Sequence, residues 1–412
     1  MSIRHGWLLA ILLTAACSDA SLPVQDAGAA APRLSAWGTN IDDDGIDDGI
    51  EWALANQFAP VLYMPNLITR TEAIIFPGDW AWPASVEWYL PRVRMRIHHN
   101  NCNDHQFLDY GQVTPTNLLQ QVHQRYTRGL FGCSHESPWQ YSNRDFHPDD
   151  HYFLEAGVNG DGDAIHPGVR DPGQWKTYVH AYRNNLNGVT LQYWFFYAYN
   201  DGISVQNHEG DWEHVDVKLD AANNPVTVYF SFHEKLNPYA PGDVSWYGGT
   251  HPQVWVADGS HANFRSESAC NTTAREGVFE SCWTNTSERW FTWSGGRGYA
   301  QGLQGGGLIN VGEKFAAMYG QEWIRYSGRW GEKGEFDWSS GPQGPAYKAE
   351  WLKDAYVAPY TGGGGTGGGG TGGGDCTGDG GGMMLQQSDG GDVTLDGGGA
   401  TLQQMALPVC PY

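Results

Sequence analysis

The chain has 412 residues and a formal net charge of −22 at pH 7, although only 17% of its residues are charged. This excess of negative charge argues against nucleic acid and anionic membrane lipid as electrostatic partners, and it favours solubility and cation binding. The 19 tryptophans and 21 tyrosines suit an extracellular β protein whose aromatic residues fill a core or line surface grooves. The length indicates one large domain with tails.

The chain begins with the features of an export signal over residues 1–16: a basic start, an apolar run, and small residues directly before Cys17. Small residues before a cysteine are typical of a bacterial lipoprotein, so we predict that Cys17 is lipidated. An ordinary signal peptide with cleavage nearby is the alternative. Either way the protein is exported, to the bacterial cell envelope as an outer-membrane lipoprotein or to the medium. The Pro/Ala-rich residues 17–39 are the expected tether.

An acidic segment at residues 40–51 matches the calcium-loop template D-x-[DN]-x-[DN]-G-x₅-E, except that asparagine takes the first place. The first, third, fifth and twelfth places are held by Asn40, Asp42, Asp44 and Glu51. The segment therefore predicts a lone calcium loop, because little room is left for a helix before it. A flexible acidic linker is the alternative reading.

A helix is expected after the loop, where Ile50, Leu54 and Phe58 recur at helical spacing. Alternation of apolar and polar residues then predicts strands over residues 91–98, 176–182, 226–233 and 253–261. Their even spacing, with Gly, Pro and Asn between them, predicts a mainly β domain over residues 50–358: an antiparallel β-sandwich with long loops and a few short helices.

The centre of this domain is the hairpin at residues 191–219. An aromatic run breaks at Asn200, and the chain returns as a strand with period two. In phase, Asp211 and Glu213 share a face with apolar residues such as Val215. A buried ionised carboxylate costs several kcal/mol unless it is paired, hydrogen-bonded or bound to a metal.

These two carboxylates predict a divalent-cation site, with Asp201 and His208 as the other ligands of Asp211 and Glu213. Three oxygen donors and one imidazole suit Ca²⁺, Mg²⁺ or Mn²⁺ better than structural zinc. The alternative is that the carboxylates are solvated at the mouth of a hairpin, with a β-bulge changing the phase. A metalloprotease is excluded because no second histidine stands four residues after His208.

Several ordered motifs resemble those of the vacuolar-protein-sorting-62-like family of plants, fungi and bacteria, over about residues 50–352. The motifs are FAPVLY at 58–63, PASVEW at 83–88, HEGDWEH at 208–214, VYFSFH at 228–233, DGSHA at 258–262, GRWG at 328–331 and GPQGP at 341–345. The resemblance implies no settled biochemical activity.

More distantly, His208-x-x-Asp211-x-Glu213 is similar to the Gly-His-Arg-His-Asp-Trp-Glu signature of the necrosis-inducing secreted cytolysins. In that family the matching His, Asp and Glu, with an upstream Asp, hold a divalent cation on a β-sandwich that attacks plant membranes. The resemblance implies the same metal role here, although this chain has Glu209 and Gly210 where the signature has Arg and His.

Three histidines, His214, His233 and His261, lie in the family motifs, and the last two are expected to close strands. Binding residues collect at such positions. They are the candidate general bases, and we expect them to share a pocket.

The chain has seven cysteines, and six remain, an even number, once Cys17 is set aside. Proximity suggests the pairs Cys102–Cys133, Cys270–Cys282 and Cys376–Cys410, one of 15 possible connectivities. Residues 361–375 are a glycine-rich linker, and residues 376–412 form a short tail.

Together these features predict an exported, lipid-anchored, divalent-metal-binding β-sandwich that recognises a surface ligand, a glycan or a lipid headgroup. One alternative is a metal-dependent hydrolase that uses the same cation with a histidine base. Another is a purely structural envelope lipoprotein.

Overall fold

The structure is a computed structural model. It describes residues 40–65, 81–99, 104–119, 125–127, 134–136, 150–156, 165–201, 207–232, 235–275, 278–279, 281–282, 284–293, 302–304, 307–332 and 340–355. Contacts divide the chain into two units, Met1–Ala358 and Pro359–Tyr412, and every described residue belongs to the first. The predicted export signal, lipidation site (Cys17), tether, glycine-rich linker and tail therefore lie outside the described residues.

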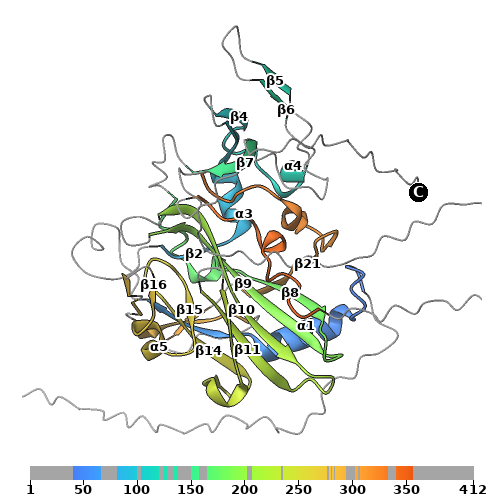
Figure 1. The fold of residues 1–412 in the computed structure, drawn as a ribbon, viewed down its shortest axis with the longest axis vertical. Helices are drawn as coiled ribbons and strands as arrows, with labels where there is room; N and C mark the ends of the chain where they lie inside the picture. Colours follow the sequence, from blue (N-terminus) through green and yellow to red (C-terminus); the bar gives the residue numbers. More distant parts are fainter. Residues whose placement is uncertain are drawn as a thin grey trace, which may run out of the picture. The chain divides into compact units, whose positions relative to one another are not determined.

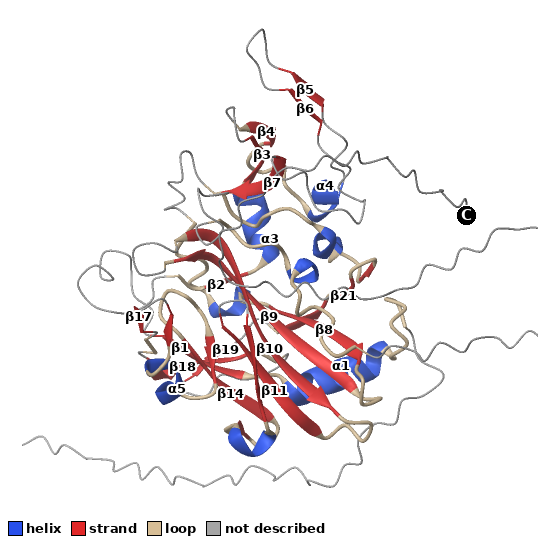
Figure 2. Cartoon of the chain, in the orientation of Figure 1, coloured by secondary structure: helices blue, strands red, loops and turns tan. Residues whose placement is uncertain are grey.

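The described fold is mainly β, as predicted, and two large sheets dominate it (Figure 2). The seven-stranded sheet has the order β12 (Lys235–Tyr239), β11 (Pro225–Phe232), β10 (His208–Leu219), β9 (Val189–Asn200), β8 (Thr177–Arg183) and β20 (Leu308–Asn310), with β2 (Pro83–Ala84) also paired to β9. The six-stranded sheet has the order β13 (Trp246–Tyr247), β14 (His251–Val256), β1 (Val61–Pro65), β18 (Thr284–Phe291) and β19 (Gly302–Gln304), with β15 (Asn263–Phe264) paired to β14.

Smaller sheets and short helices surround these two. The small sheets are β4 (His105–Leu108) with β3 (Arg94–His99) and β7 (Asp150–Glu155), β5 (Arg125–Thr127) with β6 (Ser134–Glu136), β16 (Ala274–Arg275) with β17 (Val278–Phe279), and β21 (Gly312–Glu313) with β22 (Ala316–Ala317). The α-helices are α1 (Asp48–Phe58), α3 (Val86–Tyr89), α4 (Pro115–Leu119) and α5 (Glu267–Asn271). The 3₁₀ helices are η1 (Leu90–Arg92), η4 (Pro172–Gln174), η5 (Pro241–Asp243), η6 (Glu322–Arg325) and η8 (Pro345–Tyr347).

The seven-stranded sheet is covered on both faces. Strands β8 to β11 lie side by side (Figure 1), and β9 is buried from Val189 to Ala198. On one face Phe195 packs edge-on against Trp290 of the other sheet, with ring centroids 5.5 Å apart. On the opposite face Trp194 lies 6.3 Å from Trp351, which follows η8. Burial on both faces explains the continuous aromatic run of β9, because its side chains pack against other parts of the domain on both faces.

Helix α1 confirms the helix predicted from Ile50, Leu54 and Phe58, all three of which are buried. Asp47 caps it by accepting hydrogen bonds from the backbone N–H groups of the first turn. The helix also contacts the seven-stranded sheet, called the central sheet below, because the Tyr193 hydroxyl donates to the Ala55 carbonyl at 2.9 Å. These contacts fix the helix turn that carries Glu51.

The structure corrects three details of the sequence prediction. The sheets are not purely antiparallel, because β1–β14, β18–β19 and β20–β8 are parallel pairs. The strand expected from residue 91 begins at Arg94, since Pro91 lies in η1, where a proline needs no hydrogen-bond partner for its nitrogen. The strand expected over residues 253–261 ends at Val256, so His261 lies in a turn.

A disulfide joins Cys270 to Cys282, as sequence proximity suggested. It belongs to a small buried cluster with Ala257, Ala262 and Phe264, directly beside the turn that carries His261. The other cysteines lie outside the described residues, so their pairing stays a prediction. Of the described helices, none combines the length and the apolar character that crossing a membrane requires.

Candidate functional site

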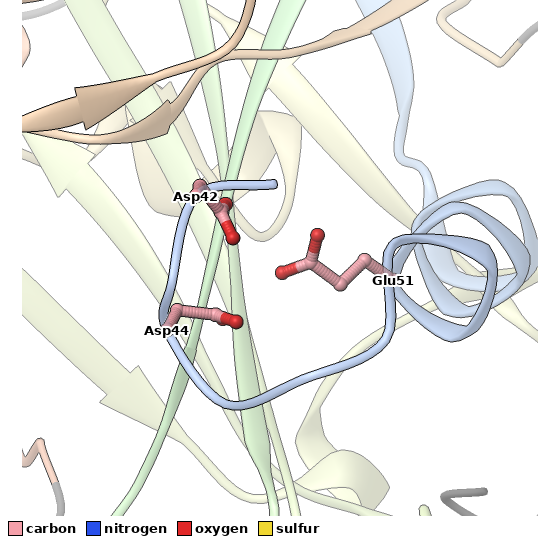
Figure 3. Close-up of side chains that lie close together, drawn as sticks. All are labelled: Asp42, Asp44 and Glu51. Carbon is pink, nitrogen blue, oxygen red and sulfur yellow. The ribbon is translucent and has the colours of Figure 1, made fainter. Parts of the chain in front are cut away.

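The acidic loop brings three of its four predicted ligands together (Figure 3). Oxygens of Asp42, Asp44 and Glu51 all lie within 4.8 Å of one another, and the three carboxylates point into one space. The backbone permits this because Gly45 turns the chain with φ of +82°, and α1 then returns Glu51 toward the loop. This is the sharp turn that the sixth place of a calcium loop requires.

Burial makes this cluster costly without a cation. Asp42 and Glu51 are each only 2% exposed. Oxygen Oδ1 of Asp42, Oδ2 of Asp44 and Oε1 of Glu51 are buried and have no hydrogen-bond partner among the described residues. Buried acceptors are nearly always satisfied in folded proteins, so this group of three carboxylates is one that could hold a metal ion.

The pKa values of these carboxyls reflect the same cost of burying them close together. Burial, followed by the charges of Asp44, Asp48 and Glu313, raises the pKa of Asp42 to about 7. Burial, followed by the charges of Asp44 and Asp42, raises the pKa of Glu51 to about 10. A bound divalent cation would remove this penalty, because it favours the ionised form of each carboxyl.

We therefore expect a defined pH dependence in the cation-free protein. A carboxyl whose pKa is higher in the folded protein than in the unfolded one stabilises the fold at pH values below its unfolded pKa, near 4. That stability is lost as the pH rises through the folded-state pKa. With a chelator present, the melting temperature should fall between about pH 5 and about pH 9, measured by scanning calorimetry. Asp42→Asn with Asp44→Asn should flatten the fall, and a parent melting temperature that rises over this range would contradict the expectation.

The first and ninth places of the loop need separate comment. Asn40, predicted as a ligand at the first place, is exposed, and its metal role stays a prediction. Asp48, at the ninth place, was not singled out from the sequence. Its Oδ1 accepts from the Ile41 N–H at 3.2 Å, and its Oδ2 is buried without a hydrogen-bond partner among the described residues. Ninth-place residues of calcium loops often bind through water, and this template position is the signal that identifies Asp48.

The second predicted site lies in the interior, on the sheet face that packs against the six-stranded sheet. Asp211 stands opposite Tyr197 and Glu213 opposite Phe195, and both carboxylates are buried. Asp211 Oδ2 accepts from Nδ1 of His261 at 2.9 Å, and Glu213 Oε2 accepts from the Ser231 hydroxyl at 2.8 Å. Burial, followed by the charge of Asp211, raises the pKa of Glu213. The expected row of two carboxylates is present, held by protein partners.

The other two predicted ligands of this site are engaged elsewhere. His208 donates from Nδ1 to the Gly210 carbonyl at 2.8 Å, and its Nε2 lies 3.0 Å from the Asn200 amide nitrogen. Asp201 Oδ1 accepts from the Asn207 amide at 3.2 Å. A cation bound to His208 through Nε2 would have to displace the Asn200 amide. The metal role of Asp201, His208, Asp211 and Glu213 stays a prediction.

The candidate histidines are separated. His214 stacks on Trp194 with centroids 3.9 Å apart, and its Nδ1 lies 2.7 Å from Asp216 Oδ1. His261 stacks on Tyr197 at 3.8 Å. Because Trp194 and Tyr197 are three residues apart on β9, their side chains point to opposite faces of the sheet. His214 and His261 therefore do not share a pocket, and His233 lies outside the described residues.

His261 has an unusual backbone. Its φ is +53°, and its side chain is fully buried against Asp211 and Tyr197. The neighbouring Gly259 approaches Asp201 so closely that an added Cβ would lie 2.3 Å from the Asp201 carbonyl oxygen. A non-glycine residue in the left-handed region costs energy and persists only where its surroundings hold it. The turn at residues 258–261 is thus built to deliver His261 to Asp211.

Comparison with known proteins gives similarity only to solved structures. No family model matches the chain, and no curated protein sequence matches it. NLPPya in complex with glucosamine is 15% identical over 46% of this chain and 71% of that one, with a TM-score of 0.26. NLPPya in complex with mannosamine is 17% identical over the same shares, also with a TM-score of 0.26.

Necrosis and ethylene inducing protein 2, from the causal agent of cocoa's witches' broom disease, is 21% identical with a TM-score of 0.21. The match covers 24% of this chain and 50% of that protein, so this chain spans half of its length. The chain is thus similar in part to proteins described as having a toxin fold for microbial attack and plant defence.

Proposed function

We propose that this chain is an exported β-sandwich protein that binds a divalent cation, calcium first of all, through residues 40–51 and recognises a glycan or lipid headgroup at a surface. The observation that carries the cation is the set of buried, unpartnered oxygens on Asp42, Asp44 and Glu51. Calcium accepts six to eight oxygens in flexible geometry, whereas magnesium requires near-ideal octahedral geometry and keeps several waters. A loop of carboxylates around a glycine turn favours calcium.

The surface ligand and the membrane anchor are the less direct parts of the proposal. Export and lipidation at Cys17 follow from the sequence before it and would place the domain at a cell surface. The sugars bound in the NLPPya structures belong to those proteins, and a sugar ligand for this chain is proposed by likeness. Membership of the vacuolar-protein-sorting-62-like family is likewise proposed, from the ordered motifs.

A second candidate function is hydrolysis, and one observation favours it. The buried Asp211–His261 pair, with Glu213 beside it, resembles an oriented base next to a carboxyl whose neutral form is favoured. Such an arrangement suits proton transfer, and a cation bound there would activate water. A purely structural envelope lipoprotein, in which cations only stiffen the fold, is the third reading.

Calcium titration by isothermal calorimetry tests the cation site. We expect the parent protein to bind one Ca²⁺ at this loop, and Asp42→Asn with Asp44→Asn to abolish that binding. The control is Asp43→Asn, which removes one negative charge from an exposed position in the same loop. Asparagine also suits the φ of +59° at Asp43. Equal stoichiometry in the parent and the double variant would refute the site.

A further inference from the structure

Three side chains of the loop converge on one space, and calcium takes six to eight oxygens. The other oxygens of a calcium site come from further side chains, backbone carbonyls and waters. A carboxylate from another part of the protein next to the cluster would be one such source.

Residues 310–313 lie directly against the loop. The Asn310 amide donates to Glu51 Oε2 at 2.8 Å, a contact between residues 259 positions apart. A Cβ added to Gly312 would lie only 3.0 Å from Cβ of Asp42, so the backbone at Gly312 packs on that ligand. The next residue is Glu313, whose charge adds to the effect of burial in raising the pKa of both Asp42 and Asp44. A fourth carboxylate thus lies near the cluster, outside the three whose oxygens lie within 4.8 Å of one another.

The same segment is anchored to the central sheet. Strand β20 pairs in parallel with β8, with Asn310 opposite Val179. Beyond it, Glu313 Oε1 lies 3.0 Å from Nε2 of His180 on β8. A carboxylate has two oxygens, so this contact with His180 is compatible with a bond from the other oxygen to a cation.

We propose that Glu313 is a further ligand of the cation held by Asp42, Asp44 and Glu51. The ion would then link the loop at residues 40–51 to the edge of the central sheet. This inference rests on the proposed function, because it needs a cation at the loop. It goes beyond the loop template, which contains no residue outside positions 40–51. The bound ion would connect the segment that follows the predicted tether to the core of the domain.

Hydrogen exchange on the parent protein is the first test, since it needs no variant to fold. Calcium is expected to slow amide exchange in residues 40–51 and also in residues 308–317, compared with the same protein in chelator. Protection confined to residues 40–51 would show a site made by the loop alone and would overturn the inference.

Calorimetry of Glu313→Gln is the second test. The amide still accepts from His180 but lacks the charge, so we expect the dissociation constant for Ca²⁺ to rise roughly tenfold or more. The control is Glu322→Gln, because the Glu322 side chain accepts a hydrogen bond from the Gly320 N–H. It should change the dissociation constant for Ca²⁺ by less than about twofold. Parent-like affinity in Glu313→Gln overturns the inference alone, whereas a parent that binds no Ca²⁺ overturns the proposed function.

Discussion

Replacing His261 by alanine should lower the free energy of unfolding by about 3 to 5 kcal/mol, the usual cost of leaving a buried carboxylate without its partner. His261 is fully buried and donates to Asp211 at 2.9 Å. Its removal leaves the Asp211 carboxylate in the interior without the imidazole, and also opens the space beside Tyr197. Urea denaturation followed by tryptophan fluorescence measures the change.

His261→Asn is the matched control for this substitution. Asparagine tolerates the left-handed backbone at this position, with φ of +53°, and its amide donates a hydrogen bond to a carboxylate. It should recover part of the lost stability. If His261→Ala changes the free energy of unfolding by less than about 0.5 kcal/mol, Asp211 and His261 are not the buried pair described above.

Calcium should stabilise the parent protein by about 2.7 kcal/mol when its free concentration is 100 times the dissociation constant, because it binds the folded state alone. Asp42→Asn with Asp44→Asn should gain nothing from calcium. In chelator the order of the two unfolding free energies should reverse, so that the double variant is at least as stable as the parent. The reason is that it lacks two carboxylates whose pKa values are raised by burial. Unfolding free energies of both proteins in calcium and in chelator give the four values needed.

This reversal separates a cation site from an acidic turn. Asp43→Asn should follow the parent in both conditions, because Asp43 is exposed. If the double variant is less stable than the parent in chelator by the same amount as in calcium, the carboxylates stabilise the fold through protein contacts and not through a bound ion.

Local sequence patterns predicted the elements whose cause is local. The spacing of Ile50, Leu54 and Phe58 gives α1, since one face of that helix is buried. The hairpin of β9 and β10 follows from an apolar run, a break at Asn200 and an alternating return. The pair Cys270–Cys282 follows from a separation of only 12 residues.

Features that depend on distant segments were not readable in this way. The turn that presents His261 looked like the end of a strand, because Gly259 and the left-handed backbone are fixed by contact with Asp201, far away in sequence. Glu313 carried no signal at all. It comes near the acidic loop only because β20 adds in parallel to β8 at the edge of the central sheet, and this pairing joins segments that no local pattern relates.

The most direct test of the cation site is a crystal structure of the mature chain grown with calcium, with an anomalous difference map for that ion. The proposed site predicts a peak among Asp42, Asp44 and Glu51, with an oxygen of Glu313 in its coordination shell. A calcium-loaded protein whose map shows no peak there, but one between Asp211 and Glu213 or elsewhere, would contradict it.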